Sequence, residues 1–334
     1  MSELPDPEYL AFARGQAAGS SPTYERLAYG VASDPWAQQA LSSVPAAKRQ
    51  PNLLFGVGRL LGAPVGDPEA FLRWLPEHWD RVRSELLTRS TQTNEAGRCA
   101  TLVPALATLP RPLALLEVGA SAGLCLYPDR YRYDWGRGVV GDGPGPVLSC
   151  AWSGEAAPPT TLPEVVWRAG LDLNPLDLTD RDDRRWLECL VWPEHDERRR
   201  RLRAAADVVA ADPPLLVTGD LVTDLPALAA RAPAGATLVV LHSAVLAYVG
   251  AATRREFVEV VRSIGAHWLA NEHPSLLTGL VAGLGTGLGD AVVPPRVEGP
   301  EPFATALDGR PVGWSGPHGQ SYRALTRPGP DLTH

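Results

Sequence analysis

A glycine-rich turn after an apolar run is the part of this 334-residue sequence best suited to chemistry. Residues 113–123 read Leu-Ala-Leu-Leu-Glu-Val-Gly-Ala-Ser-Ala-Gly. This pattern predicts a buried parallel strand, a tight turn and the start of a helix. Such a turn presents backbone N–H groups and the positive end of a helix dipole, and its glycines let a ligand approach closely. The segment therefore predicts a ligand site at the end of a central strand.

The turn fits two kinds of chemistry. Residues 117–123 read E-x-G-x-S-x-G, which resembles motif I of class I S-adenosylmethionine-dependent methyltransferases. Residues 119–123 also read G-x-S-x-G, the nucleophile elbow of α/β-hydrolases, in which Ser121 is the nucleophile. A third interpretation is a glycine turn that binds no ligand.

The elements around the turn favour the methyltransferase interpretation. From residue 113 onward, predicted strands alternate with predicted helices, as in a parallel sheet with right-handed crossovers. The predicted strands are 113–118, 165–171, 215–218, 237–242 and 267–271, and the predicted helices are 180–191, 194–211, 225–232 and 253–263. Residues 303–307 and 321–325, with a turn at Asp308-Gly309, predict an antiparallel hairpin. An α/β-hydrolase normally reaches its elbow after several strands, and no strand is predicted before residue 113.

The first 110 residues predict helices only. Helix starts with an N-cap acceptor followed by proline stand at Ser21-Pro22, Asp34-Pro35 and Asp67-Pro68. We therefore expect a helical cap over residues 1–110 that covers the strand ends and excludes water. Residues 111–334 are expected to form the second domain, with an insertion at about 127–163. The expected fold class is α/β: a Rossmann-like methyltransferase sheet of five parallel strands plus a C-terminal antiparallel hairpin.

Composition restricts the partners of the chain. A net charge of −7 argues against nucleic acid. No apolar run is long enough to span a bilayer, and the N-terminus lacks the layout of a signal peptide. Four scattered cysteines fit reduced, buried thiols rather than a zinc site or a disulfide framework. We therefore expect a cytoplasmic protein with a small-molecule substrate and no metal, while the oligomeric state stays open.

Five longer stretches of the chain form patterns that are specific enough to identify a family. They are Thr93–Arg98, Leu116–Leu124, Asp129–Trp135, Gly170–Asp177 and His242–Tyr248. In these stretches the chain resembles a bacterial family known as domain of unknown function 2332. That resemblance supplies no reaction, so the expected function depends on the likeness to methyltransferases.

The methyltransferase resemblance implies S-adenosylmethionine as cofactor and methyl transfer to a small-molecule oxygen or nitrogen. It places the amino-acid part of the cofactor against the backbone of Gly119, Ala120, Ser121 and Gly123. Glu117 would lie near the cofactor ammonium.

Two strand-end acids complete the implied cofactor site. Asp172 would accept hydrogen bonds from the ribose hydroxyls, and Asp220 would accept from the adenine amino group. Asp172 lies 49 residues after Gly123, whereas about twenty is usual in dinucleotide-binding folds. Arg98 would reach the cofactor carboxylate, although a plain salt bridge fits it equally well.

His242 and Ser243 end the fourth predicted strand, where methyl transfer takes place in that family. His242 is the candidate base, although a histidine in an apolar strand also fits core packing. In the hydrolase alternative, Asp220 and either His242 or His318 would complete a triad with Ser121. Glu272 and its neighbour in sequence, a histidine, have no second pair at metal-ligand spacing.

The remaining polar and aromatic candidates are expected to contact substrate. These are Asn94, Tyr131, Tyr133 and Tyr248. Each has a structural alternative, because Asn94 fits the cap of a helix and the tyrosines fit the core.

Overall fold

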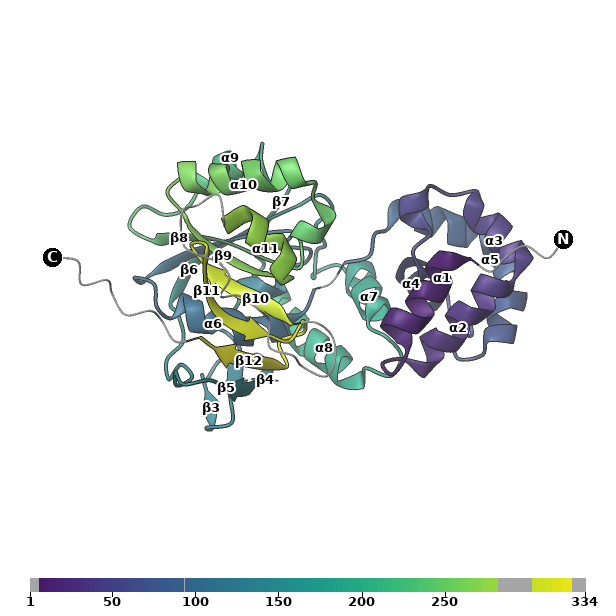
Figure 1. Ribbon diagram of the computed structural model, residues 1–334, viewed down its shortest axis with the longest axis horizontal. Helices are drawn as coiled ribbons and strands as arrows, with labels where there is room; N and C mark the ends of the chain where they lie inside the picture. The colour runs from purple at the N-terminus through teal and green to yellow at the C-terminus, as the bar shows by residue number, and fades with distance from the viewer. Residues whose placement is uncertain (1–5, 93, 282–301, 326–334) are drawn as a thin grey trace. The chain divides into compact units, whose positions relative to one another are not determined.

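The computed structural model describes residues 6–92, 94–281 and 302–325 (Figure 1). The chain divides into two compact units. A helical unit comprises residues 1–93 and 179–203, and an α/β unit comprises residues 94–178 and 204–334. This division differs from the expected boundary at residue 110 in two ways. Residues 94–110 belong to the α/β unit, and residues 179–203 return to the helical unit.

The helical unit begins with the helices that its prolines predicted. Its helices are α1 Pro7–Phe12, the π-helical η1 Ala13–Ala17, α2 Pro22–Ser33, α3 Pro35–Ser42, the 3₁₀ turn η2 Ala46–Lys48, α4 Pro51–Leu60, α5 Pro68–Thr88 and α7 Arg181–Leu190. The side chains of Ser21, Asp34 and Asp67 accept the N–H groups of the first turns of α2, α3 and α5 at 3.2, 2.7 and 3.1 Å. All three predicted starts are confirmed. Among the described residues before 113, no strand occurs.

The helical unit has an aromatic core, and Trp192 of residues 179–203 packs against it. The Phe55 ring contacts four other rings at centroid distances between 4.9 and 6.2 Å; they belong to Tyr9, Phe12, Tyr24 and Phe71. Trp186 on α7 is buried beside Gly56 on α4, where an added Cβ would lie 3.2 Å from the indole. The absence of a side chain at Gly56 lets α7 pack closely on α4.

The α/β unit contains a nine-stranded sheet, ordered β5-β12-β11-β10-β9-β8-β1-β6-β7. The strands are β1 Leu113–Val118, β5 Ala151–Ser153, β6 Val165–Asp172, β7 Leu215–Thr218, β8 Thr237–Ser243, β9 His267–Glu272, β10 Phe303–Leu307, β11 Arg310–Ser315 and β12 Ser321–Ala324. Strands β9, β8, β1, β6 and β7 pair in parallel. They match the five predicted strands to within one residue at each end. The fold is therefore mixed α/β, with a large and mostly parallel sheet.

The C-terminal strands pair differently from the prediction. The turn at Asp308-Gly309 is present, but it joins β10 to β11 and not to residues 321–325. Those residues form β12, which pairs with the other edge of β11. Gly313 lies on β11 where a Cβ would be 2.2 Å from the Tyr322 ring. The glycine that interrupts the strand pattern of β11 is thus required by close packing against Tyr322.

The predicted insertion forms a small sheet of its own. Its strands are β2 Arg132–Asp134, β3 Val139–Val140 and β4 Val147–Ser149, in the order β3-β2-β4. The next strand, β5, joins the main sheet beside β12. This extra structure occupies the long gap between the glycine turn and β6. Asp172 therefore ends the strand that pairs with β1, as predicted.

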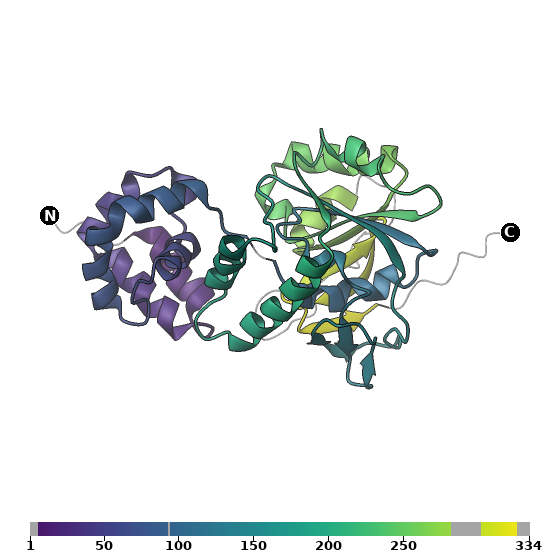
Figure 2. The same cartoon turned by 180° about the vertical axis from the view of Figure 1, so that it is seen from behind.

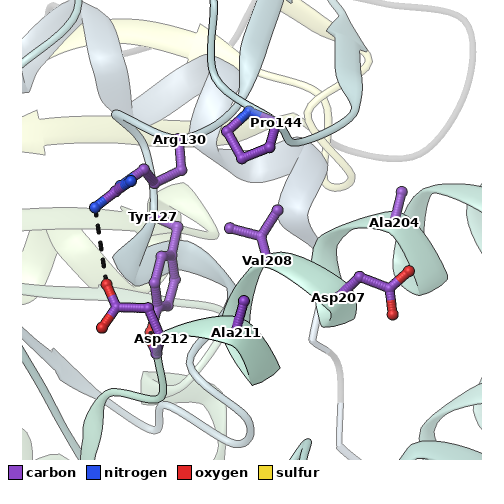
Figure 3. Close-up of a pocket in the computed structure, with 8 residues that line it drawn as sticks. All are labelled: Tyr127, Arg130, Pro144, Ala204, Asp207, Val208, Ala211 and Asp212. Carbon is purple, nitrogen blue, oxygen red and sulfur yellow. Dashed lines mark hydrogen bonds and ion pairs between the residues drawn. The ribbon is translucent and has the colours of Figure 1, made fainter.

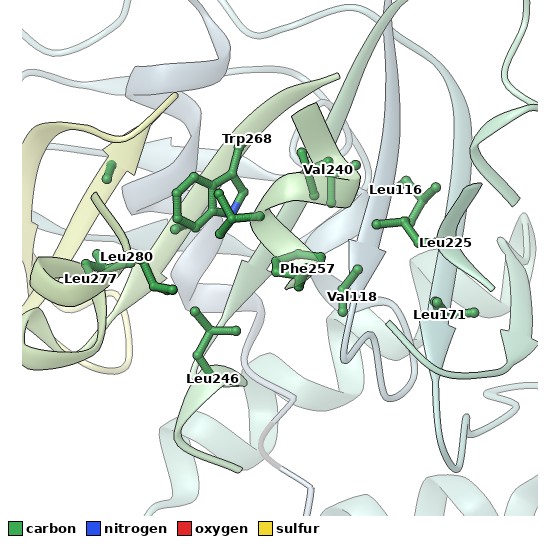
Figure 4. Close-up of a cluster of buried hydrophobic side chains, with 14 of the residues drawn as sticks. Leu116, Val118, Leu171, Leu225, Val240, Leu246, Phe257, Trp268, Leu277 and Leu280 are labelled. Carbon is green, nitrogen blue, oxygen red and sulfur yellow. The ribbon is translucent and has the colours of Figure 1, made fainter. Parts of the chain in front are cut away.

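Helices cover both faces of the main sheet. On one face lie α9 Leu225–Ala229, α10 Ala251–Ser263 and α11 Pro274–Val281 (Figure 1, Figure 2). They pack on a cluster that includes Leu116, Val240, Phe257 and Trp268 (Figure 4). On the other face, α6 Cys99–Leu106 contacts β9, β10 and β12. Within the described chain, no helix has the length and apolar character needed to cross a membrane.

Four further helical elements complete the described structure. They are the 3₁₀ turns η3 Ala96–Arg98, η4 Leu124–Leu126 and η5 Leu246–Tyr248, and the helix α8 Asp196–Ala211. The four predicted helices after residue 180 correspond to α7, α8, α9 and α10, with ends within three residues of the prediction.

Candidate functional site

The glycine turn, residues 119–123, follows β1 but does not present the N–H groups expected of it. Gly119 and Ala120 both donate to the Leu171 carbonyl, at 2.8 and 3.3 Å. Ser121 N–H donates to Asp172 Oδ2 at 2.7 Å. The element that follows is the three-residue η4 rather than a long helix. The expectation of free N–H groups and a strong helix dipole at this turn is therefore wrong, because the end of β6 accepts the N–H groups of residues 119–121 and no long helix follows.

Two hydrogen bonds of the Asn94 side chain stabilise the glycine turn. Its Nδ2 donates to the Ala120 carbonyl at 3.1 Å, and its Oδ1 accepts from Leu124 N–H at 3.3 Å. Gly123 N–H donates to the same Ala120 carbonyl at 2.7 Å. The expected substrate contact of Asn94 is not what the structure shows, because both amide atoms are bound to the turn. The helix cap belongs to Glu95, whose carboxylate accepts from the backbone two residues later at 2.9 Å.

We expect Asn94→Ala to lower the free energy of unfolding by about 1–3 kcal/mol, because it leaves the Leu124 N–H without its acceptor and removes one of the two donors to the Ala120 carbonyl. Urea unfolding of the variant and the wild type measures this difference. Hydrogen exchange at the Leu124 amide localises it. An unchanged unfolding midpoint, with unchanged exchange at Leu124, would contradict the role of Asn94.

Three buried polar groups without partners lie at the carboxyl ends of β1 and β8. Glu117 Oε2, Ser121 Oγ and Ser243 Oγ have no hydrogen-bond partner among the described residues, and their residues are 5%, 5% and 8% exposed. Glu117 pairs with Leu241, two residues before Ser243, so Glu117 and Ser243 point to the same face of the sheet. Buried polar groups are normally hydrogen-bonded. We call these three residues the unpaired cluster.

The strand order places the unpaired cluster at a special point of the sheet. Counted along the chain, the five parallel strands are ordered 3-2-1-4-5, and the order reverses between β1 and β8. Open α/β sheets bind their ligands at the carboxyl ends of the strands beside such a reversal. Topology and unsatisfied polar groups therefore indicate the same place.

Glu117 is the titratable member of the unpaired cluster, and its pKa is shifted. Burial raises the pKa of Glu117 well above its usual value, and neighbouring Cys125 and Asp172 raise it further. The Arg98 guanidinium lowers this pKa and so opposes the other effects. The carboxyl group therefore holds its proton to a higher pH than an exposed glutamate.

Arg98 is buried beside the cluster and binds backbone. Its Nε donates to the Pro317 carbonyl at 2.9 Å, and its Nη1 donates to the Ser243 carbonyl at 3.0 Å. Arg98 thus joins the end of β8 to the loop before β12. These carbonyl contacts add to the two roles expected for Arg98, which both stay predictions.

The two predicted acids stand at the ends of β6 and β7. The carboxylate oxygens of Asp172 accept one N–H each, from Ser121 at 2.7 Å and from Asn174 at 2.8 Å. Oδ1 of Asp220 accepts the N–H groups of the second and third residues after it, at 2.8 and 3.1 Å. Each Asp172 oxygen keeps a second lone pair. Asp172 is thus able to hold the glycine turn and still accept from a ligand.

His242 does not have the geometry of a base. It is fully buried, and its Nε2 lies 2.9 Å from Trp268 Nε1, which is a donor only. Nε2 is therefore the acceptor, and Nδ1 donates to Glu272 Oε1 at 2.8 Å. Both ring nitrogens are engaged, so the predicted role of His242 as general base is not supported by this arrangement. For the same reason His242 is not placed to activate Ser121.

The predicted aromatic substrate contacts separate into two groups. Tyr131 and Tyr133 are fully buried, and their hydroxyls donate to the carbonyls of Leu124 and Pro128 at 2.8 and 2.6 Å. Burial raises the pKa of both phenols well above the usual value. These two tyrosines are core residues with engaged hydroxyls, and the substrate contact expected of them stays a prediction. Tyr248, in contrast, is 80% exposed in η5, directly after β8.

Sequence reasoning gave three residues of this region no role at the strand ends. Leu173, 77% exposed directly after β6, lies on the opposite side of β1 from Tyr248 in the strand order. Glu272 and Val245 contact the end of β8 and the glycine turn, as described below. The pattern that indicates Glu272 is an acid at the end of a predicted strand, and the same pattern predicted Asp172. Among the described residues, no group of His, Cys, Asp or Glu side chains is arranged to hold a metal ion.

A cavity of about 300 Å³ lies elsewhere in the α/β unit (Figure 3). Its lining comes from α8 and the segments after η4: Tyr127, Arg130, Pro144, Ala204, Asp207, Val208, Ala211 and Asp212. Arg130 and Asp212 form an ion pair across it at 3.8 Å. Asp212 precedes β7, so this part of the cavity is at the amino end of that strand. No predicted site residue lines it.

Comparison with known proteins identifies the family of the chain. Residues 7–291 match the family described as "Uncharacterized protein conserved in bacteria (DUF2332)", so the chain belongs to that family, as predicted. No curated protein and no solved structure matches the chain.

Proposed function

We propose that this member of the family binds S-adenosylmethionine at the carboxyl ends of β1, β6 and β8 and transfers its methyl group to a small molecule. The observation that carries the proposal is the buried Glu117 carboxyl group, whose Oε2 has no partner. A ligand ammonium would supply the missing donor, and a charge-assisted hydrogen bond is strong in a buried site.

The order of the parallel strands supports the same proposal. The order 3-2-1-4-5 is shared with sheets that bind nucleotides at the strand ends. An antiparallel strand, β10, follows next to β9. Together with the turn after β1, this arrangement favours a Rossmann-like methyltransferase sheet, by analogy of fold.

The residues around the turn fit the parts of the cofactor. Glu117 would hold the ammonium, and the hydroxyls of Ser121 and Ser243 would bind other polar atoms of the amino-acid part. Asp172 would accept from the ribose hydroxyls with its remaining lone pairs. Asp220 would accept from the adenine amino group. The list of contacts implied by the resemblance thus changes in one respect: side chains, rather than the N–H groups of the glycine turn, would provide most of the binding.

Apolar side chains flank these polar groups. Leu173 and Tyr248 are exposed on opposite sides of β1 and would provide apolar surface for the adenine ring. The bound cofactor supplies an electrophilic methyl group. Since His242 offers no free nitrogen, we favour an acceptor nitrogen whose lone pair is available without prior removal of a proton.

Calorimetry with S-adenosylmethionine and its demethylated product tests the proposal. We expect both to bind, and we expect binding to release a proton to the buffer. Burial raises the pKa of Glu117 in the free protein and a bound ammonium lowers it, so the carboxyl group gives up its proton on binding at a pH between these two pKa values. Titrations in buffers of different ionisation enthalpy measure the released proton.

The sign of the pH dependence follows from the same linkage. Affinity should rise with pH until the pKa of Glu117 in the free protein is reached, and then level off. Absence of binding by either compound would end the methyltransferase proposal. Binding without turnover on any acceptor would favour a protein that only binds the ligand.

One observation keeps a serine hydrolase as the second candidate. Ser121 has a positive φ of 51°, and the nucleophile of a G-x-S-x-G elbow sits on a similarly strained turn. However, Ser121 Oγ has no hydrogen-bond partner among the described residues, so no histidine is in place to activate it. A fluorophosphonate probe distinguishes the candidates, because labelling at Ser121 would support the hydrolase and oppose our proposal.

A further inference from the structure

We propose that His242 is a positioning residue that, through Glu272 and Val245, fixes the turn after β8 against the glycine turn and so sets the shape of the ligand site. The effect of His242 on ligand binding rests on the proposed function. The mechanical part of the inference, that His242 fixes the turn after β8, depends only on contacts within the protein.

A chain of hydrogen bonds connects the core to the turn after β8. Trp268 Nε1 donates to His242 Nε2 at 2.9 Å, and His242 Nδ1 donates to Glu272 Oε1 at 2.8 Å. The same oxygen accepts the backbone N–H groups of Val245 at 2.8 Å and Leu246 at 3.2 Å. Glu272 is 1% exposed. His242 therefore orients the carboxylate that holds two consecutive N–H groups of the turn.

Val245 carries this restraint to the glycine turn. A Cβ added at Gly119 would lie 2.4 Å from Val245 Cγ2. The Val245 side chain thus occupies the space that a side chain at residue 119 would fill. The contact joins the turns after β1 and β8, which are the two sides of the strand-order reversal.

Backbone strain occurs in both turns. Among the described non-glycine residues, positive φ angles occur at Ser121 (51°), Ala244 (58°) and Asp308 (51°). Asp308 belongs to the β10–β11 hairpin, and the other two belong to the turns that meet at Gly119 and Val245. Strained residues persist only where the surrounding structure over-determines them. At Ala244, its own N–H donates to the Asn271 carbonyl at 3.1 Å, and Glu272 holds the next two N–H groups.

A purely structural role for His242 makes a different prediction. The ring also packs edge-on against Phe257, with centroids 5.6 Å apart. That ring contact does not involve the turn after β8. If His242 only fills space, loss of packing at Phe257 should disturb the turn as much as loss of the ring hydrogen bonds does.

Hydrogen exchange of the full chain tests the mechanical part. In His242→Phe, which keeps a ring but loses both hydrogen bonds, we expect exchange at the Val245 and Leu246 amides to accelerate about tenfold or more. His242→Asn keeps a donor toward Glu272 and should restore much of the protection. Phe257→Leu is the matched core control, and it should lower the melting temperature without selective exchange at these two amides. Unchanged exchange in His242→Phe, or the same selective exchange in Phe257→Leu, would overturn the inference.

Calorimetry with S-adenosylmethionine tests the consequence for binding. We expect His242→Phe to weaken affinity about tenfold. Val245→Ala removes the contact with Gly119 without touching a hydrogen bond, and it should weaken affinity about threefold or more. Val245→Ala also tests the inference if His242→Phe does not fold. If Val245→Ala binds as the wild type does, the inference fails for binding. If the wild type itself does not bind while exchange follows the expected pattern, the proposed function fails and the positioning role stands.

Discussion

Replacing Glu117 with Gln is expected to raise the melting temperature of the free protein at pH 8 and to leave it nearly unchanged at pH 4. Burial raises the pKa of Glu117 in the folded state. Between the unfolded and folded pKa values, the unfolded chain is ionised while the folded protein still holds its proton. Stability from this group is therefore fully present below the unfolded pKa and is lost as pH rises through the folded pKa. Gln removes that loss.

Calorimetric melting at the two pH values measures the effect. Glu164→Gln, at an exposed position just before β6, is the matched control and should change neither melting temperature. A lower melting temperature of Glu117→Gln at pH 8 would show that the carboxylate is stabilising, and would contradict the site as we describe it.

The same variant should weaken S-adenosylmethionine binding at least about tenfold, because a charge-assisted hydrogen bond contributes about 1.5–3 kcal/mol. It should also abolish the proton release on binding. Together, the two results would identify Glu117 as a group that the fold keeps at a cost in stability for the benefit of a ligand. Unchanged affinity with unchanged proton release would remove Glu117 from the site.

Gly119→Ala is expected to lower the free energy of unfolding by about 2–5 kcal/mol. Two effects add: a left-handed backbone costs a non-glycine residue about 1–2 kcal/mol, and overpacking costs about 1–3 kcal/mol. Gly119 has a φ of 67°, and its added Cβ would overlap Val245 Cγ2 at 2.4 Å. Urea unfolding measures the loss.

Gly62 provides the matched control for the backbone term. Its φ is 83°, and nothing lies within 4 Å of an added Cβ. Gly62→Ala should therefore show the conformational cost without the overlap. Val245→Ala should recover about 1 kcal/mol or more of the loss in Gly119→Ala and none of the loss in Gly62→Ala, as a double-mutant cycle measures. Equal losses at the two glycines would contradict the contact between the turns.

The sequence by itself determined the elements whose information is local. The helix starts at Ser21, Asp34 and Asp67 follow from an N-cap oxygen and a proline in adjacent positions. The parallel strands follow from short apolar runs between turn residues, and the acid at the end of β6 follows from its place after such a run. These features depend on neighbours within a few residues, so a pattern along the chain is sufficient to predict them.

Only the tertiary structure decided what the individual side chains do. His242 is separated from Trp268 and Glu272 by 26 and 30 residues, and those partners occupy both of its nitrogens. Tyr131 donates to a carbonyl that no periodicity reveals. The sequence did not reveal the small sheet that the insertion forms, and the proline and glycine of β11 hid a strand. A hydrogen bond or a close contact between distant segments depends on strand order and register, and these are fixed when the whole sheet buries its faces. The sequence therefore indicated the strand ends that form the candidate site, whereas packing decided that Glu117 Oε2 has no partner among the described residues and that both ring nitrogens of His242 have one.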